Sequence, residues 1–598
     1  MTVKQSQFLH PAALALIALL LQGCGSAPQQ DKSAGTSTTQ STFKNQTSET
    51  NVQLPPSQFH PQFAEADEAL RQLDWMTAST VLALLDEEAL TRNDRDYRDY
   101  LLARIDYVRG DQVQASTRLK ALDRPEVALG IAYRSYNFQR HLLSLQRAYL
   151  DSARLGVRIM EIAPAKDLPG LKRSLWHDLQ RSPESEIAQA RSSAADPTWL
   201  GWLELANIAN DNATTLSTAL PRWQINYPGH PAASPLPGGL EYMLEPAVTP
   251  QQVALVLPLS GRLAPAGKAI RDGYLAHYFT ARDKGDAPTE VKVIDSDLYG
   301  SATEAYTAAV QQGAQLVVGP LSKASVAELA KQTNRVVPTI ALNRIDQPVA
   351  TSTTALVQLS LAPADEARQL AHLAFGDGGR RALVLRPAGR WGDEMESALD
   401  EQWRALGGTT TQVISYTGKD DYSSSVKSGL GIEASEQRRR KLRDMLAINL
   451  EFTPRRRADL DTVFMLSRTP EEARAIKPLL AFHYAGALPV YASSSAYGAR
   501  DDSRNQDLNG TTIVELPWLL GSNPALQQSL VGANSDYYTR LNALGADAYL
   551  LQSRLVQLQA GPDALIRGDT GLLTMNSQLQ IVRELPPARF DGDRLKSL

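Results

Sequence analysis

The sequence predicts a multidomain protein, with an all-α helical domain in its N-terminal part and an α/β domain of two lobes after it. Three observations lead to this fold class. Apolar residues recur three and four positions apart from Pro61 to about Ala232. The chain then passes a Pro/Gly-rich stretch, and beyond it apolar strands alternate with amphipathic helices in two successive series.

The N-terminus has the features of a lipoprotein signal peptide, predicted over residues 1–23. Its apolar run, Ala12 to Leu21, covers about ten residues, whereas a helix needs roughly 20 to cross a bilayer. We therefore expect a targeting segment that is removed from the mature protein. Leu21 and Gly23 precede Cys24 in the spacing that signal peptidase II requires, although Gln22 departs from the preferred Ala or Ser.

Cys24 is the only cysteine among the 598 residues, and we predict that it carries the lipid. The alternative is an ordinary secretory signal with an incidental cysteine. No internal disulfide can form with one cysteine. Gly25 stands where an Asp would retain the protein at the inner membrane, so the sequence favours a lipid anchor in the outer membrane, on its periplasmic face.

Residues 24–58 are predicted to be the lipidated cysteine and a flexible linker. This stretch is rich in Ser, Thr, Gln, Asn and Ala and nearly lacks large apolar side chains, so it cannot bury enough surface to offset its chain entropy. Over the whole chain, 43% of residues are hydrophobic, 21% are charged and the formal net charge is -4. No basic excess points to nucleic acid as a partner.

Residues 59–232 are expected to form short helices, with breaks at Gly110-Asp111, Gly156 and Gly170. Helix pairs that recur about thirty to forty residues apart resemble degenerate tetratricopeptide (TPR) repeats. An irregular helical bundle is the alternative. Solenoids of this kind usually bind proteins or peptides.

Residues 233–250 are expected to be a joint, and residues 251–598 the two-lobed α/β domain. The first strand–helix series runs from VALVLPLS to PTIAL, and the second runs from ADEARQLAHLAF to PVYAS. Such alternation predicts parallel sheets that are covered on both faces.

The opening of this domain, VALVLPLSGRLAPAGKAIRDGYLAHYF, resembles that of type I periplasmic binding proteins, as do LVVGPLSKASV and PTIALN. A closer resemblance, over roughly residues 60–598, is to the LpoA family of penicillin-binding protein activators, which are outer-membrane lipoproteins. The segments that carry it are WQINYPGHPAA, AIKPLLAFHYAGALPVYASSSAY and DLNGTTIVELPWLL. The resemblance implies a non-catalytic protein that stimulates the transpeptidase of a class A penicillin-binding protein of the 1a type. Peptidoglycan is a further expected contact.

The search for catalytic motifs predicts no catalytic residue, metal site or cofactor. Ser424 and Lys427 form an SxxK string, but it shares its lysine with a KTG-like string, whereas the enzymes that use these elements bring them together from distant positions. GRLAPAGKA lacks the spacing and the Ser or Thr of a phosphate-binding loop. The eight histidines include no HExxH pair.

Two sets of residues are candidates for binding. In open α/β sheets ligands lie beyond the carboxyl ends of the strands, and the cleft candidates at those ends are Ser260, Gly261, Asp295, Ser296, Ser322 and Asn343. The alternative is that they are helix caps and turn residues. A basic insertion, from Tyr422 to Arg457, is either a solvated helix face or a partner surface, and its candidates are Arg438, Arg439, Arg440, Arg455, Arg456 and Arg457.

The sequence thus supports a tethered activator of a peptidoglycan synthase. The alternative function is a solute-binding lipoprotein of a transport or sensing system. A simple solute receptor does not need a helical domain, which counts against that alternative.

Overall fold

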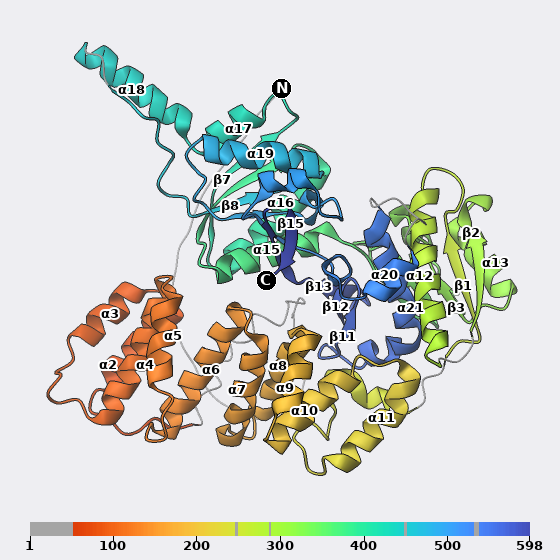
Figure 1. The fold of residues 1–598 in the computed structure, drawn as a ribbon, viewed down its shortest axis with the longest axis horizontal. Coiled ribbons are helices and arrows are strands. Elements are labelled where there is room, and N and C mark those ends of the chain that lie inside the picture. Colours follow the sequence, from red (N-terminus) through yellow and green to blue (C-terminus); the bar gives the residue numbers. More distant parts are fainter. Residues whose placement is uncertain (1–51, 246–248, 286–288, 448–450, 531–537) are drawn as a thin grey trace, which may run out of the picture.

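The computed structural model describes residues 52–245, 249–285, 289–447, 451–530 and 538–598 (Figure 1). The predicted signal peptide, Cys24 and the linker up to residue 51 lie outside these ranges. The predicted fold class is confirmed, because helices fill the N-terminal part and a two-lobed α/β domain follows. No helix within the described ranges is both long and apolar enough to cross a membrane.

The helical domain consists of successive helix pairs that lie in a row (Figure 1). The first helices of the pairs begin at residues 60, 92, 129, 168 and 197, which is the predicted spacing. The pairs are α2 (His60–Arg71) with α3 (Trp75–Ala83), α4 (Arg92–Val108) with α5 (Gln112–Ala121), α6 (Leu129–Leu145) with α7 (Tyr149–Ile162), α8 (Leu168–Arg181) with α9 (Glu184–Ser193), and α10 (Pro197–Ile208) with α11 (Ala213–Asn226).

Two of the three predicted helix breaks are wrong. Gly110 does separate α4 from α5, with a φ of 92° that favours glycine. Gly156 and Gly170 instead lie inside α7 and α8. A Cβ on Gly156 would lie 3.3 Å from Leu175 of α8, so this glycine allows the two helices to pack closely.

The linker ends earlier than the sequence suggested, because residues 52–58 pack on the helical domain. Val52 is buried beside Tyr133, and its carbonyl accepts a hydrogen bond from Arg134 Nη1 (3.0 Å). A Cβ on Gly130 would lie 2.2 Å from the Gln53 carbonyl. Leu54 also packs against the core of the helical domain, so two apolar side chains and a close backbone approach hold this short segment.

The joint is a packed element. The 3₁₀ helix η3 (Pro237–Met243) lies against α8 and α21 (Thr539–Gln559). Gly238 has a φ of 66°, and a Cβ there would lie 2.2 Å from Trp176 Nε1. The Gly238 carbonyl accepts hydrogen bonds from Gln557 Nε2 (2.7 Å) and from the Leu565 amide (3.2 Å). The joint therefore fastens the helical domain to the α/β domain.

Lobe 1 is a parallel five-stranded sheet between two layers of helices. Its strand order is β2-β1-β3-β4-β5, and alternate residues of β1 face the two layers. The strands are β1 (Gln252–Leu257), β2 (Glu290–Asp295), β3 (Leu316–Val318), β4 (Thr339–Ala341) and β5 (Leu356–Gln358). One layer contains α12 (Ala264–Asp283) and α21, and the other contains α13 (Ala302–Gln311) and α14 (Lys323–Ala330).

Lobe 2 repeats this strand order, as β7-β6-β8-β9-β10, and adds an antiparallel edge formed by β14 and β15. The strands are β6 (Arg381–Pro387), β7 (Thr409–Tyr416), β8 (Thr462–Met465), β9 (Val490–Ala492), β10 (Thr512–Val514), β14 (Pro587–Asp591) and β15 (Arg594–Ser597). The covering helices are α15 (Pro363–Gly376) and α16 (Arg390–Ala405) on one face, and α17 (Tyr422–Gly429) and α19 (Pro470–Phe482) on the other.

The two lobes are joined by three passages of the chain: between β5 and α15, between β10 and α21, and between β13 and β14. A small antiparallel sheet lies at the junction. Its strands are β11 (Ile566–Gly568), β12 (Gly571–Met575) and β13 (Ile581–Glu584). The core of α8, α10 and α11 extends to Leu565, next to β11, and to Leu572 of β12.

Candidate functional site

The cleft candidates of lobe 1 follow strands β1 and β2 and bond mainly to one another. Ser260 Oγ donates to Asp295 Oδ2 (2.8 Å), and the Leu259 amide donates to Asp295 Oδ1 (2.9 Å). Burial opposes ionisation of Asp295, but its hydrogen bonds outweigh this effect and lower the pKa of the carboxyl group. Gly261 has a φ of 68° in the turn before α12, and Ser296 begins a short 3₁₀ helix, η4 (Ser296–Leu298).

The other two cleft candidates lie on neighbouring loops. Ser322 caps α14 by accepting a hydrogen bond from the Ser325 amide (3.0 Å). Asn343 Nδ2 donates to the Leu321 carbonyl (2.9 Å), which ties the loop after β4 to the loop after β3. The polar groups thus serve as caps and turn braces, as the structural alternative expected. Binding of a ligand at these residues stays a prediction.

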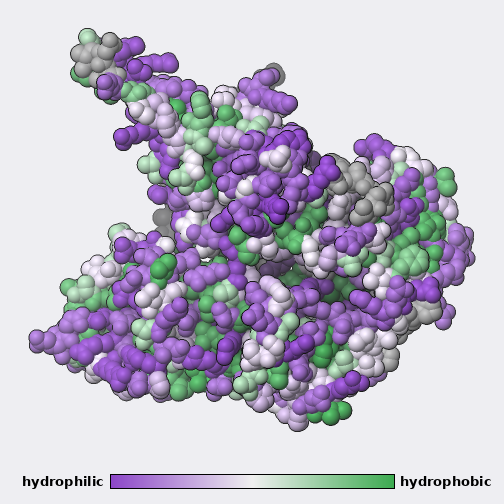
Figure 2. Space-filling model, in the orientation of Figure 1, coloured by the Kyte–Doolittle hydropathy of each residue, from purple (hydrophilic) through white to green (hydrophobic). Residues whose placement is uncertain are grey.

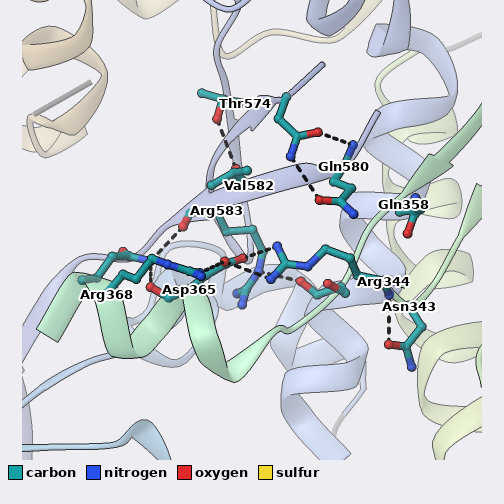
Figure 3. Close-up of polar contacts among 12 residues, drawn as sticks. Asn343, Arg344, Gln358, Asp365, Arg368, Thr574, Gln580, Val582 and Arg583 are labelled. Carbon is teal, nitrogen blue, oxygen red and sulfur yellow. Dashed lines mark hydrogen bonds and ion pairs between the residues drawn. The ribbon is translucent and has the colours of Figure 1, made fainter. Parts of the chain in front are cut away.

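The residue after Asn343 reaches across to the other lobe. Arg344 Nη1 and Nη2 lie 2.9 and 3.1 Å from the two carboxylate oxygens of Asp365, in the first turn of α15 (Figure 3). Arg368 contacts the same carboxylate at 3.2 Å. Asp365 is only 7% exposed, so this bidentate pair lies in a region shielded from water. The positive charge of Arg344 in lobe 1 is therefore already paired with a carboxylate of lobe 2.

Beside this pair, side chains connect β5, the loop after β4 and the junction sheet (Figure 3). Gln580 Nε2 donates to the Ile345 carbonyl (3.0 Å), and the Ile345 amide donates to Gln358 Oε1 (2.9 Å). Arg583 of β13 is buried, and its Nε donates to the Ser360 carbonyl (2.8 Å) on the passage between β5 and α15. These contacts fasten the junction sheet to lobe 1 and to the passage that leads into lobe 2.

A second ion pair joins the lobes at the start of α21. Arg540 Nε lies 3.1 Å from Glu515 Oε1, and Glu515, directly after β10, has a fully buried side chain. Arg540 Nη2 also donates to the carbonyls of Ser494 and Tyr497 (3.0 Å each). A buried pair with this many hydrogen bonds is satisfied, and loss of one partner would leave a buried charge.

Glu366 lies in the same region, where its carboxylate accepts hydrogen bonds from the Ser494 amide and from Ser494 Oγ (2.8 Å). Burial raises the pKa of Glu366 to about 7, and the nearby Glu515 acts in the same direction. No sequence pattern pointed to Arg344, Glu366, Glu515 or Arg540, because their partners lie on distant segments. The interlobe site thus consists of charged groups that neutralise one another.

The helical domain is attached to the same junction. Arg181 of α8 forms a bidentate pair with Glu584 of β13, with Nη2 2.9 Å from Oε2. Arg567 Nη2 donates to the carbonyls of Gln180 (2.6 Å) and Ser182 (3.0 Å). Arg147 lies 3.1 Å from Asp377, which is in lobe 2. Contacts with both the junction sheet and lobe 2 fix the orientation of the helical domain.

The basic insertion divides into two parts. Arg438, Arg439 and Arg440 lie on α18 (Ile432–Leu446) and are exposed. Arg457 pairs with Asp459 (2.6 Å), and Arg456 Nη1 donates to the Leu460 carbonyl (3.3 Å), so these two side chains anchor the returning segment. Arg455 is exposed. Four of the six candidates are therefore exposed, and binding of a partner by them stays a prediction.

The SxxK string lies on α17, and the side chains of its serine and lysine form local contacts. Ser424 Oγ donates to the Asp421 carbonyl (3.0 Å), and Lys427 pairs with Glu436 at 2.9 Å. Over the residues that the structure describes, no cluster of three His, Cys, Asp or Glu side chains could hold a metal ion.

The molecule is a multidomain scaffold: a row of helix pairs is fixed to an α/β domain whose two lobes are joined by ion pairs. The two-lobed domain belongs to the class of periplasmic-binding-protein-like folds. The chain belongs to the family described as LppC putative lipoprotein, whose model matches residues 40–592. This match, together with relatives that carry the LpoA name, confirms the resemblance to the LpoA family.

Relatives that match this chain are named "Penicillin-binding protein activator LpoA". The protein of Photobacterium profundum is 28% identical over 98% of this chain and 97% of its own length. That of Vibrio vulnificus is 30% identical over 69% of this chain and 70% of its own. Full-length LpoA from Haemophilus influenzae, a crystal structure, matches 94% of this chain and 98% of its own at 21% identity and a TM-score of 0.46.

Proposed function

We propose that this chain is a non-catalytic activator, which binds a class A bifunctional penicillin-binding protein of the 1a type and stimulates its transpeptidase. The observation that carries the proposal is the Photobacterium profundum relative, named a penicillin-binding protein activator, which aligns with 98% of this chain. Because the alignment covers both domains, the helical domain and the two lobes are expected to act as one unit.

The interlobe contacts support an activator over a solute receptor. A solute receptor closes its lobes around a ligand, whereas here Arg344–Asp365 and Arg540–Glu515 join the lobes directly. Breaking buried pairs of this kind is costly. Calorimetry with free amino acids and with soluble peptidoglycan fragments separates the two functions, because sub-micromolar affinity for a free solute would favour the receptor.

The direct test uses the purified chain without residues 1–24 and the class A synthases of the same bacterium. We expect binding in a pull-down and a larger fraction of cross-linked muropeptides, with glycan polymerisation measured in parallel to assign the effect to the transpeptidase. A monofunctional transpeptidase is the specificity control. Absence of both binding and stimulation would contradict the proposal.

The anchoring is part of the proposal: lipid on Cys24 holds the chain to the outer membrane, and the following residues let it reach through the peptidoglycan layer. A Cys24→Ser variant should move from the membrane fraction to the soluble periplasmic fraction. Deletion of residues 25–51 with Cys24 kept should abolish activation in cells but not in solution. Equal activity in cells would refute the spacer role.

A further inference from the structure

Helix α18 forms an arm that projects from lobe 2 (Figures 1 and 2). Its buried residues, Ile432 and Ser435, lie in the first turn, and every residue from 437 to 447 is exposed. Figure 2 shows the arm standing clear of the body, with a mostly hydrophilic surface. Along this exposed part, the Arg439 guanidinium lies over the Phe452 ring of the returning segment, 5.3 Å from its centroid. A helix of this length is marginal in water with so little tertiary packing, so a partner surface would stabilise it.

The arm combines positive charge with exposed apolar side chains. Five cations lie close together, at Arg438, Arg439, Arg440, Lys441 and Arg443. Leu442, Met445 and Leu446 are exposed by 48%, 77% and 53%. Their spacing of three and four positions places them on one face of the helix. Exposed apolar groups at helical spacing beside arginines are typical of a surface that a partner covers.

The base of the arm carries exposed aromatic side chains at the end of α19. Phe482 is 73% exposed and Tyr484 is 52% exposed. His483 between them is buried, and its Nε2 lies 3.4 Å from Ser423 Oγ of α17. Tyr484 has a φ of 64°, an uncommon conformation for a residue other than glycine.

These aromatic residues lie close to the start of the arm. Lys427 of α17 pairs with Glu436 of α18 (2.9 Å), and the charges of both residues act on His483. Helices α17, α18 and α19 therefore meet at one corner of lobe 2. We use the term arm corner for Leu442, Met445 and Leu446, the five cations, Phe482 and Tyr484.

We infer that the arm corner is the docking surface for an acidic, partly apolar protein surface. Aromatic residues and arginine are the usual anchors of protein interfaces, and the cations select an anionic partner. The arm projects from the lobe (Figure 1), so its apolar residues and the aromatic pair lie on two separate elements, α18 and the end of α19. A folded protein surface can contact both elements. The inference rests on the proposed function, because that function identifies the docked partner as the synthase.

The test uses three variants of the full chain without residues 1–24. The first is Arg438→Glu with Arg439→Glu and Arg440→Glu, the second is Leu442→Ser with Met445→Ser, and the third is Phe482→Ala with Tyr484→Ala. Matched controls on other faces are Arg390→Glu with Arg404→Glu on α16, and Leu84→Ser with Ile225→Ser on the helical domain, all at exposed positions. Thermal melts verify that each variant is folded.

We expect each arm-corner variant to weaken the Kd for the synthase at least tenfold, with a slower association rate and a weaker salt dependence for the charge reversal. The controls should stay within about twofold of the unaltered chain. If the unaltered chain binds and all three variants bind equally well, the arm corner is not the docking surface and the proposed function stands. If the unaltered chain binds no class A synthase, both the docking surface and the proposed function are overturned.

Two further outcomes would also overturn the inference. A photoreactive residue at position 445 that cross-links in cells to a second copy of this chain would show self-association. Binding to vesicles of phosphatidylglycerol that is lost in the charge reversal, with no effect of that variant on the synthase, would show a lipid contact instead.

Discussion

Arg181 of the helical domain and Glu584 of the junction sheet form a bidentate pair, with Nη2 2.9 Å from Oε2. Burial opposes ionisation of Glu584, but Arg181 outweighs it and lowers the pKa of the carboxyl group. Burial also lowers the pKa of the adjacent His177 to about 4, so the histidine is neutral at pH 7. The charge of Glu584 is therefore paired with Arg181, whose side chain is largely buried.

Arg181→Ala should loosen the contact between the helical domain and the junction. Loss of two charge-assisted hydrogen bonds costs about 2 kcal/mol, and we expect a larger radius of gyration in small-angle scattering together with faster proteolysis near residues 233–250. Arg173→Ala is the control, because its pair with Asp563 is half exposed and should contribute little. Equal behaviour of the two variants would contradict this role for Arg181.

Arg540→Met should destabilise the two-lobed domain, because it leaves the buried Glu515 carboxylate without its partner. The expected loss is about 3 to 5 kcal/mol in urea unfolding. Adding Glu515→Gln removes the unpaired charge, so the double variant should be more stable than Arg540→Met alone. If the double variant loses as much free energy of unfolding as the two single variants lose together, the residues act independently and this role of the pair is contradicted.

Glu366→Gln should change how stability depends on pH. Since burial raises the pKa of Glu366 from 4.5 to about 7, the folded protein keeps a proton that the unfolded chain releases. This contribution to stability is full below the unfolded pKa and is lost as pH rises through about 7. In urea unfolding, the free energy of unfolding of the variant relative to the unaltered protein should increase as the pH rises from about 5 to about 8. A pH-independent difference would refute this.

Gly545→Ala should destabilise lobe 1, because α21 and α12 approach each other at glycines. A Cβ on Gly545 would lie 2.0 Å from the Ile270 carbonyl, so the helices would have to separate. We expect a loss of about 1 to 3 kcal/mol. Gly170→Ala is the matched control: it lies inside α8 with no neighbour within 4 Å, and should gain about 0.5 to 1 kcal/mol. Thermal melts measure both.

Periodicity predicted the elements that fold locally. Apolar spacing in residues 60–226 and the two strand–helix series found the helix pairs and most strands of both sheets. The C-terminal elements were missed: α21 returns to lobe 1, and β14 with β15 returns to the edge of lobe 2. Nothing local marks these returns, because each depends on contacts with residues far away in the chain, as in the hydrogen bond of Asn542 to the Ala269 carbonyl.

The sequence by itself determined the fold class and the family, because periodicity and motifs are local properties. Only the tertiary structure decided which charges meet. It paired Arg344 with Asp365, Arg540 with Glu515 and Arg181 with Glu584. It also separated the exposed Arg438 on the arm from Arg457, which anchors the returning segment. A charge acquires its role from the partner it is buried against, and the fold alone supplies that partner.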